Sequence, residues 1–329
     1  MKRYHFETLR PICPVCRDRL EIGSVMQETN KDILEGILLC SGRQCQSEYP
    51  IISGIPILVA DRRSYISQNI LSVMSGTDMS ADMESLVGDC CGPGSFFDVT
   101  RQYLSTYTFD HYGDLNPDET SDIPGSVVRL LEKGLAMTDN PIQGPTIDIG
   151  CSVGRTSFEL AAKTKNPVLG IDLNFAMLRT ASQILRQGIV RYPKRRIGMV
   201  YDRHEFAVSF DNSELVDFWA CDAAALPFSD QCFGTVTSLN VLDCMLSPTD
   251  HLHSLARVLK AGGTAILSTP YDWSAAVTPM ESWIGGHSQR SQKRGSPEDM
   301  LRLLLTKGAH PQSVEKMKII SELRAVPWS

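Results

Sequence analysis

The sequence lacks any apolar run of the roughly 18 to 20 residues that a membrane-spanning helix needs. Its first residues, MKRYHFETLRPICPVC, also lack the apolar core of a secretion signal. A surplus of positive charge is missing as well, because the 329 residues carry a formal net charge of -6. An acidic chain has no global reason to bind nucleic acid. These absences predict a cytoplasmic protein.

The composition is that of a soluble globular protein with a core, since 42% of the residues are hydrophobic and 21% are charged. The length favours more than one structural unit. We expect a small unit over residues 1–62, a linker with a possible helix over 63–100, and a larger unit over 101–329. In a reducing compartment the ten cysteines should be metal ligands, small buried side chains or reactive thiols.

Four cysteines near the start of the chain form two close pairs, Cys13 with Cys16 and Cys40 with Cys45. Two such pairs, separated by about two dozen residues, suit the tetrahedral coordination of a structural zinc ion. Residues 33–40 are predicted as a strand that delivers the second pair, and residues 49–59 as strand-like with a turn at Gly54. The alternative is four unrelated free cysteines.

This pattern, CPVC followed by a cysteine pair and YPIISGIPILV, resembles a family of small zinc-ribbon proteins over roughly residues 9–60. Members of that family activate tRNA, rRNA and protein methyltransferases as a separate subunit. The resemblance implies a structural role for the first unit, a possible protein partner, and no catalysis.

Short apolar runs alternate with helical patterns in the second half of the chain. The expected strands lie within residues 144–150, 166–173, 216–223, 234–241 and 263–270. The expected helices lie within residues 155–164, 174–187 and 248–263. Such alternation predicts an α/β fold, a Rossmann-like doubly wound parallel sheet with helices on both faces. Ligands of these sheets bind beyond the carboxyl ends of the strands.

A glycine-spaced turn, Gly150 to Gly154, follows the first of these strands and precedes a helix. It lacks one glycine of the dinucleotide-binding fingerprint, and Asp148 precedes it by two residues. A carboxylate at this place would repel a pyrophosphate, whereas it suits a ligand with a cationic head. S-adenosylmethionine carries an ammonium and a sulfonium group and no phosphate.

Acidic and amide residues end the following strands. Asp172 is placed to accept both hydroxyls of a ribose. Asp222 could accept the amino hydrogens of an adenine, with Ala223 beside the ring. Asn240 and Asp243 would lie under the methyl group.

The order of these markers resembles the class I S-adenosylmethionine-dependent methyltransferases over roughly residues 125–270. The resemblance implies that one group of residues contacts the cofactor. These are Asp148, Gly150, Cys151, Ser152, Gly154, Asp172, Leu173, Asp222, Ala223 and Asn240.

The methyl acceptor is less well specified, since methyl transfer needs alignment more than acid–base groups. The chain has no Asn-Pro-Pro-Tyr-type signature of base methylation. Residues 103–115, 186–217 and the motifs LDCMLSP (242–248), PYDW (270–273) and TPMESWIGG (278–286) are similar to the methyltransferase domain of ovothiol-synthesis enzymes, which methylates an imidazole nitrogen. That similarity implies a pocket for a small imidazole or thiol compound, lined by Tyr107, His111, Tyr112, Tyr271, Trp273 and Trp283. Otherwise these aromatic residues are packing residues.

Two other functions remain open. The basic segment 186–203 and the zinc-ribbon pattern favour an RNA methyltransferase, and a non-catalytic scaffold with the cofactor fold is the third possibility. Residues 313–329 are predicted to supply one of the two antiparallel strands that usually close this sheet, with the final strand missing.

Overall fold

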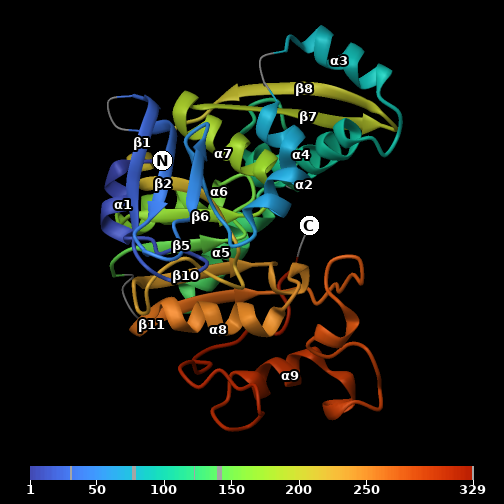
Figure 1. The fold of residues 1–329 in the computed structure, drawn as a ribbon. Helices are drawn as coiled ribbons and strands as arrows, with labels where there is room; N and C mark the ends of the chain where they lie inside the picture. The colour runs from blue at the N-terminus through green and yellow to red at the C-terminus, as the bar shows by residue number, and fades with distance from the viewer. Residues whose placement is uncertain (30–31, 76–78, 122, 139–142, 328–329) are drawn as a thin grey trace.

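The computed structural model describes residues 1–29, 32–75, 79–121, 123–138 and 143–327 (Figure 1). The strands are β1 (Leu20–Glu28), β2 (Ile33–Cys40), β3 (Glu48–Ile52), β4 (Ile55–Leu58), β5 (Thr146–Ile149), β6 (Val168–Asp172), β7 (Ile189–Ile197), β8 (Val200–Ala207), β9 (Val216–Cys221), β10 (Phe233–Leu239) and β11 (Leu259–Ser268). The helices are α1 (Arg3–Leu9), α2 (Arg62–Met74), α3 (Ala81–Cys90), α4 (Phe96–Tyr112), α5 (Ser126–Ala136), α6 (Arg155–Thr164), α7 (Phe175–Gln187), α8 (Pro248–Val258) and α9 (Pro297–Leu304).

One sheet runs through most of the molecule. In the described part of the chain it has nine strands, in the order β1-β2-β3-β4-β9-β6-β5-β10-β11. The pairs from β4 to β11 are parallel, and those from β1 to β4 are antiparallel. This topology confirms the predicted α/β fold with a mostly parallel sheet and a small N-terminal β region.

Successive side chains of the strands point to opposite faces and fill two separate cores. Val168 and Phe218 pack with α5, α6 and α7, whereas Leu169 and Trp219 pack with α1 and α8. Because both faces are covered, the strands read as nearly continuous apolar runs. This explains why the sequence indicated their positions well.

The four N-terminal strands continue the sheet instead of forming a detached unit. Strand β4 lies parallel to β9, with Ile57 opposite Ala220 and Leu58 opposite Cys221. Ser53 and Gly54 take positive φ angles of 52° and 78° in the turn between β3 and β4, where the turn was predicted. The predicted strand over 33–40 is confirmed as β2.

Helix α1 fastens the N-terminal strands to the larger part of the sheet. The Lys2 amide donates to Asp217 Oδ2 at 2.8 Å, and the His5 ring nitrogen Nε2 lies 2.9 Å from the Leu215 carbonyl oxygen. His5 is fully buried, and this burial lowers its pKa. A neutral imidazole is therefore part of the junction.

Three helices occupy residues 62–112, and each begins at a side chain that caps it. Asp61, Ser80 and Ser95 accept hydrogen bonds from backbone amides in the first turns of α2, α3 and α4. Helix α4 packs on β7, the first strand of a two-stranded hairpin with β8. Figure 1 shows this hairpin and α3 together at one end of the molecule.

The C-terminal segment differs from the expectation. Residues 313–327 form no strand, so the predicted closing strand is wrong and β11 is the edge of the sheet within the described residues. Val314 is buried against α9, but Ile319 and Ile320 are exposed. Met317, Ile319 and Leu323 alternate as in a strand, but the segment pairs with no strand among the described residues, and Ile319 and Leu323 stay exposed. No helix among the described residues has the length and hydrophobicity to cross a bilayer.

Candidate active site

The glycine turn joins β5 to α6 and brings backbone close to its neighbours. Gly150 and Gly154 have φ angles of 71° and 89°, which L side chains rarely adopt. A Cβ atom at Gly150 would lie 2.3 Å from Val241 Cγ2, and one at Gly154 would lie 2.6 Å from Phe218 Cζ. Both positions therefore require glycine, and no side chain caps the N-terminus of α6 where it follows this turn.

Asp148 precedes this turn, and its carboxylate accepts hydrogen bonds from three hydroxyl groups of the protein. Its Oδ2 accepts hydrogen bonds from Thr156 Oγ1 at 2.6 Å and Ser157 Oγ at 2.7 Å, and its Oδ1 accepts one from Thr237 Oγ1 at 2.7 Å. Burial raises the pKa of this carboxyl group. Asp148 thus fixes the first turn of α6 on the sheet, and its effect on a ligand would be electrostatic.

Asp172, at the end of β6, is half-buried and faces the turn. Its Oδ2 accepts the Ser152 amide at 2.9 Å, and its Oδ1 accepts the Asn174 amide at 2.8 Å. Burial raises the pKa of Asp172. A carboxylate has about four acceptor positions, so two of them remain for donors on a ligand.

The residues after β9 and β10 complete this edge. Asp222 Oδ1 accepts the Ala224 amide at 2.9 Å, and Ala223 is buried. Asn240 has a φ angle of 56°, and its Oδ1 accepts a hydrogen bond from Ser268 Oγ at 2.9 Å. Because β9, β6, β5 and β10 are adjacent parallel strands, all the predicted cofactor residues share one edge of the sheet.

Two of the remaining predicted cofactor residues differ in exposure. Cys151 is fully buried, which raises its pKa, so it fills a small space in the turn as a neutral thiol. Leu173 is 43% exposed, and its carbonyl oxygen accepts a hydrogen bond from Tyr65 Oη at 3.0 Å. Tyr65 belongs to α2, within the segment interpreted as a linker. Sequence reasoning missed it, because a single tyrosine in a weak helical pattern carries no signal.

The three predicted aromatic residues of α4 lie in different environments. Tyr112 is fully buried, and its hydroxyl donates to the Val153 carbonyl of the glycine turn at 2.8 Å. His111 is 5% exposed, and burial, followed by the charge of Arg155, lowers its pKa to about 3. Tyr107 is 40% exposed. Tyr107 is thus the member of this set most open to a ligand.

Burial raises the pKa of Tyr107, and Cys244, Asp172 and Asp243 add smaller contributions in the same direction. Asp172 ends β6, and Asp243 and Cys244 follow β10. We therefore expect Tyr107 to face the carboxyl ends of these strands.

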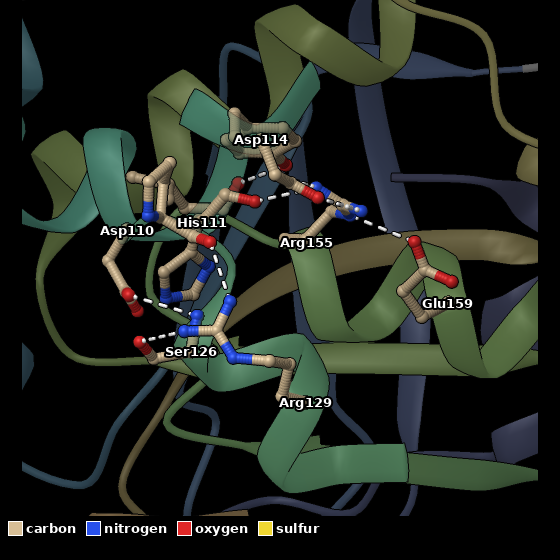
Figure 2. Close-up of polar contacts among 10 residues, drawn as sticks. Asp110, His111, Asp114, Ser126, Arg129, Arg155 and Glu159 are labelled. Atoms are coloured by element: carbon tan, nitrogen blue, oxygen red, sulfur yellow. Dashed lines mark hydrogen bonds and ion pairs between the residues drawn. The ribbon is translucent and has the colours of Figure 1, made fainter. Parts of the chain in front are cut away.

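A buried arginine holds α4 in this position. Arg155, the first residue of α6, is 4% exposed and donates from Nη1 to the His111 carbonyl and to Asp114 Oδ1, both at 2.8 Å. Its Nε donates to Glu159 Oε1 at 2.9 Å. Figure 2 shows this guanidinium between the end of α4 and the first turn of α6, with Ser126 bonded to Asp110 nearby.

Replacing Arg155 with methionine should loosen α4. We expect the free energy of unfolding to fall by about 2 kcal/mol, because Asp114, Glu159 and the His111 carbonyl would lose the guanidinium group that donates to them. Urea unfolding measures the change. Lys163→Met is the matched control, since its ion pair with Glu132 is exposed and should contribute under ~0.5 kcal/mol. Equal losses in the two variants would contradict this role for Arg155.

The second predicted aromatic group follows β11. The rings of Trp273 and Trp283 stack with centroids 6.1 Å apart, and Trp283 Nε1 donates to the Thr278 carbonyl at 2.8 Å. Trp273 Nε1 is buried without a hydrogen-bond partner. Tyr271 has a φ angle of 56°, and burial, followed by the charges of Glu298 and Glu322, raises its pKa to about 12.

Asp243 lies shortly after the end of β10 and is hydrogen-bonded to the segment that carries Tyr271 and Trp273. It lies in the short 3-10 helix η3 (Leu242–Cys244) after β10 and is 3% exposed. Its Oδ2 accepts the Asp272 amide at 2.8 Å, whereas Oδ1 is buried with no hydrogen-bond partner. A buried carboxylate oxygen without a donor is costly, which makes this atom a candidate acceptor for a hydrogen bond from a ligand.

The four predicted zinc ligands meet at one point. The Sγ atoms of Cys13, Cys16, Cys40 and Cys45 all lie within 4.8 Å of one another. The Cys13–Cys45 distance is 3.7 Å, and the Cys16–Cys40 distance is 3.3 Å. Four sulfurs at 2.3 Å from a central zinc ion would lie about 3.8 Å apart, so the cluster fits a tetrahedral site.

Comparison with known proteins bears on the segment that contains the glycine turn and the parallel strands. Residues 147–267 match the family model described as a methyltransferase domain. The class predicted from the sequence, a class I S-adenosylmethionine-dependent methyltransferase domain, is confirmed for this segment.

The relatives cover only part of the chain. The chain is 24% identical over 185 residues to ajmaline N-methyltransferase of Rauvolfia serpentina, covering 54% of this chain and 54% of that protein. It is 27% identical over 180 residues to methyltransferase GfsG of Streptomyces halstedii, covering 52% and 54%. The chain thus spans about half the length of the curated relatives it matches.

A solved structure shares part of the fold at a low score. It is phosphoethanolamine N-methyltransferase 2 of Haemonchus contortus in complex with S-adenosyl-L-methionine. The sequence identity is 19%, the TM-score is 0.37, and the alignment covers 52% of this chain and 35% of the other.

Proposed function

We propose that the protein transfers the methyl group of S-adenosylmethionine to a nitrogen or thiol of a small molecule, such as an imidazole compound. The match to a methyltransferase domain over residues 147–267 supports the reaction class. The observation that carries the acceptor side is the buried, unpartnered Asp243 Oδ1 at the same sheet edge as the cofactor residues. A small N–H or S–H donor would satisfy it.

The chain would hold the cofactor along the edge formed by β9, β6, β5 and β10. The two acceptor positions left on Asp172 suit the two ribose hydroxyls, and Asp222 with Ala223 suits the adenine. The glycine turn lets the amino acid part approach the backbone at the start of α6. When bound, S-adenosylmethionine supplies a methyl group already activated by a positive sulfur.

On the acceptor side, Tyr107, Tyr271 and the Trp273–Trp283 pair would exclude water and set the orientation. Asp243 Oδ1 would accept a hydrogen bond from the acceptor and so direct the lone pair of its nucleophilic atom toward the methyl carbon. Alignment of this kind supplies most of the rate enhancement in a one-step displacement.

The proposal is tested by calorimetry with S-adenosylmethionine and S-adenosylhomocysteine, followed by transfer of a radiolabelled methyl group. The assay offers total RNA and a metabolite extract in parallel. Label is expected in the small-molecule fraction. Label found only in RNA would contradict the proposed acceptor.

Replacing Asp243 with asparagine is expected to lower kcat by about 10- to 100-fold, because the acceptor loses a charged hydrogen-bond partner. The affinity for S-adenosylhomocysteine should stay within about twofold, since Asp243 lies on the acceptor side. Steady-state kinetics and calorimetry measure the two quantities. Asp250→Asn, at an exposed acid in the first turn of α8, is the control. Unchanged kcat in D243N would contradict the role.

The RNA alternative loses support from the ion pairs of the hairpin. The bridges Arg191–Glu205, Lys194–Glu119 and Arg196–Asp202 have lengths of 2.7, 2.6 and 3.5 Å. Arg186 and Arg195 donate to the carbonyl oxygens of Ser53 and Gly198. Basic side chains already paired within the protein release few counterions from a phosphate backbone. The scaffold alternative is disfavoured by the full set of polar residues at the sheet edge.

We also propose that the four clustered cysteines bind a structural zinc ion, which a reducing, cytoplasmic compartment would favour by keeping the thiols unoxidised. Backbone and side-chain donors stand beside the sulfurs: the Gly42 amide lies 3.3 Å from Cys40 Sγ, and Tyr49 Oη lies 3.0 Å from Cys13 Sγ. Such donors stabilise thiolates around a metal. The N-terminal strands then act within the same chain, through β4, and a separate protein partner is not needed for sheet pairing.

A further inference from the structure

We propose that the protein has a second binding site, for an anionic amphiphile such as a medium-chain carboxylate, in a cavity outside the candidate active site. The cavity has a volume of about 290 Å³. Its walls come from α2, α3, α4, α7 and the β7–β8 hairpin. Figure 1 shows α3 and the β7–β8 hairpin at one end of the molecule, with α4, α2 and α7 between this end and the sheet.

The cavity is separate from the predicted cofactor residues, none of which lines it. It follows α7 from Ala176 in the first turn to Gln187 at the end, passing Thr180 and Ile184. The core face of α7, with Phe175 and Leu178, packs on the sheet instead. A molecule in this cavity would therefore contact α7 from outside and leave the sheet edge free.

Arg101 is the feature that points to an anion. Its side chain lines the cavity and is 5% exposed, yet the structure shows neither a hydrogen bond nor an ion pair for it, and Nε and Nη2 are buried without partners. The guanidinium carbon lies 4.3 Å from the ring centre of Tyr201 and 4.9 Å from that of Phe97. Aromatic faces offset only part of the free energy lost by burying a charge.

The other guanidinium groups that line the cavity already have partners. Arg179 donates to the carbonyl oxygens of Ser75 and Val73, Arg191 pairs with Glu205, and Arg203 donates to the Met79 carbonyl. Among the described lining residues Glu84 is the sole carboxylate, so the lining carries more cationic than anionic side chains. The buried Asp98 precedes Arg101 by three residues on α4, but no ion pair joins the two in the described residues. Arg101 is therefore the lining cation without a hydrogen-bonded partner.

The rest of the wall suits an apolar body. It includes the side chains of Val87, Phe96, Phe97, Leu104, Ile184 and Ile189. A carboxylate at Arg101 with a chain of about ten carbons would fill this space and remove the apolar wall from water.

Calorimetric titration with decanoate tests the site. The full-length protein is expected to bind one decanoate per chain, and 1-decanol about tenfold more weakly, because the neutral head cannot pair with Arg101. Saturating S-adenosylhomocysteine should leave the decanoate affinity unchanged. Absence of saturable decanoate binding, or competition by S-adenosylhomocysteine, would overturn the proposal.

Variants assign the binding to this cavity. Arg101→Gln should weaken decanoate binding about tenfold or more. Arg101→Lys keeps the positive charge and should retain most of the wild-type affinity. Val87→Trp, on α3, should block the cavity while the Arg101 residue itself is kept, and this variant serves if R101Q fails to fold. Arg196→Gln, at an exposed residue of the hairpin, is the matched control. Equal affinity in the wild type, R101Q and V87W would refute the site.

Discussion

Replacing Asp172 with alanine is expected to remove measurable binding of S-adenosylmethionine while the fold persists. The carboxylate accepts two backbone amides and has two acceptor positions left, which we assign to the ribose hydroxyls. Loss of two charged hydrogen bonds should weaken binding by roughly 3 kcal/mol or more, or at least about 100-fold. Calorimetry with S-adenosylmethionine and S-adenosylhomocysteine measures this change.

The control for this variant is Asp202→Ala, which removes an exposed carboxylate from the hairpin. Circular dichroism and the Tm should show that both variants fold. The Ser152 and Asn174 amides lose an acceptor in D172A, so a small fall in Tm is expected from the turn alone. If D172A binds the cofactor with the affinity of the wild type, the ribose lies elsewhere.

Replacing Cys13 with serine is expected to release about one zinc ion per chain and to destabilise more than the N-terminal strands. Structural zinc contributes about 10 kcal/mol or more to the folding of small domains. Because β4 pairs with β9, unfolding of the N-terminal strands would also expose an edge of the methyltransferase sheet. We therefore expect faster amide hydrogen exchange in β9 as well as in β1 to β4.

Metal analysis, thermal unfolding and hydrogen exchange measure these effects, and a chelator should reproduce them in the wild type. Cys90→Ser is the matched control, since Cys90 is exposed and far from the cluster in sequence. Wild-type protein that is purified free of metal and keeps the Tm of the zinc-loaded form would contradict the proposal.

The parallel sheet could be predicted because its strands are buried on both faces. Runs such as residues 144–150 are short, apolar and separated by helical patterns. The length and the spacing of the apolar residues therefore both indicated strands. The glycine turn was readable for a related reason: Gly150 and Gly154 need positive φ angles that few other residues tolerate. The convergence of four cysteines also followed from spacing.

Long-range pairing could not be predicted in this way. Residues 55–58 indicate a buried strand, but nothing in them identifies β9 as the neighbour. The role of Arg155 depends on the end of α4, far from it in sequence. The wrong strand near the C-terminus shows the opposite error, since Ile319 and Ile320 suggested a strand but lie exposed without a sheet partner. A local sequence pattern indicates which residues could be buried, but contacts between distant segments determine whether they are.

The pairing of β4 with β9 has a consequence for how the two units remain together. Strand β4 and strand β9 belong to one polypeptide, so the local concentration of β4 at β9 is set by the covalent chain between Leu58 and Val216 instead of by expression level. Two separate chains joined by these few backbone bonds would come apart on dilution. In this chain the N-terminal strands and the parallel sheet are made in a one-to-one ratio, and dilution does not separate β4 from β9.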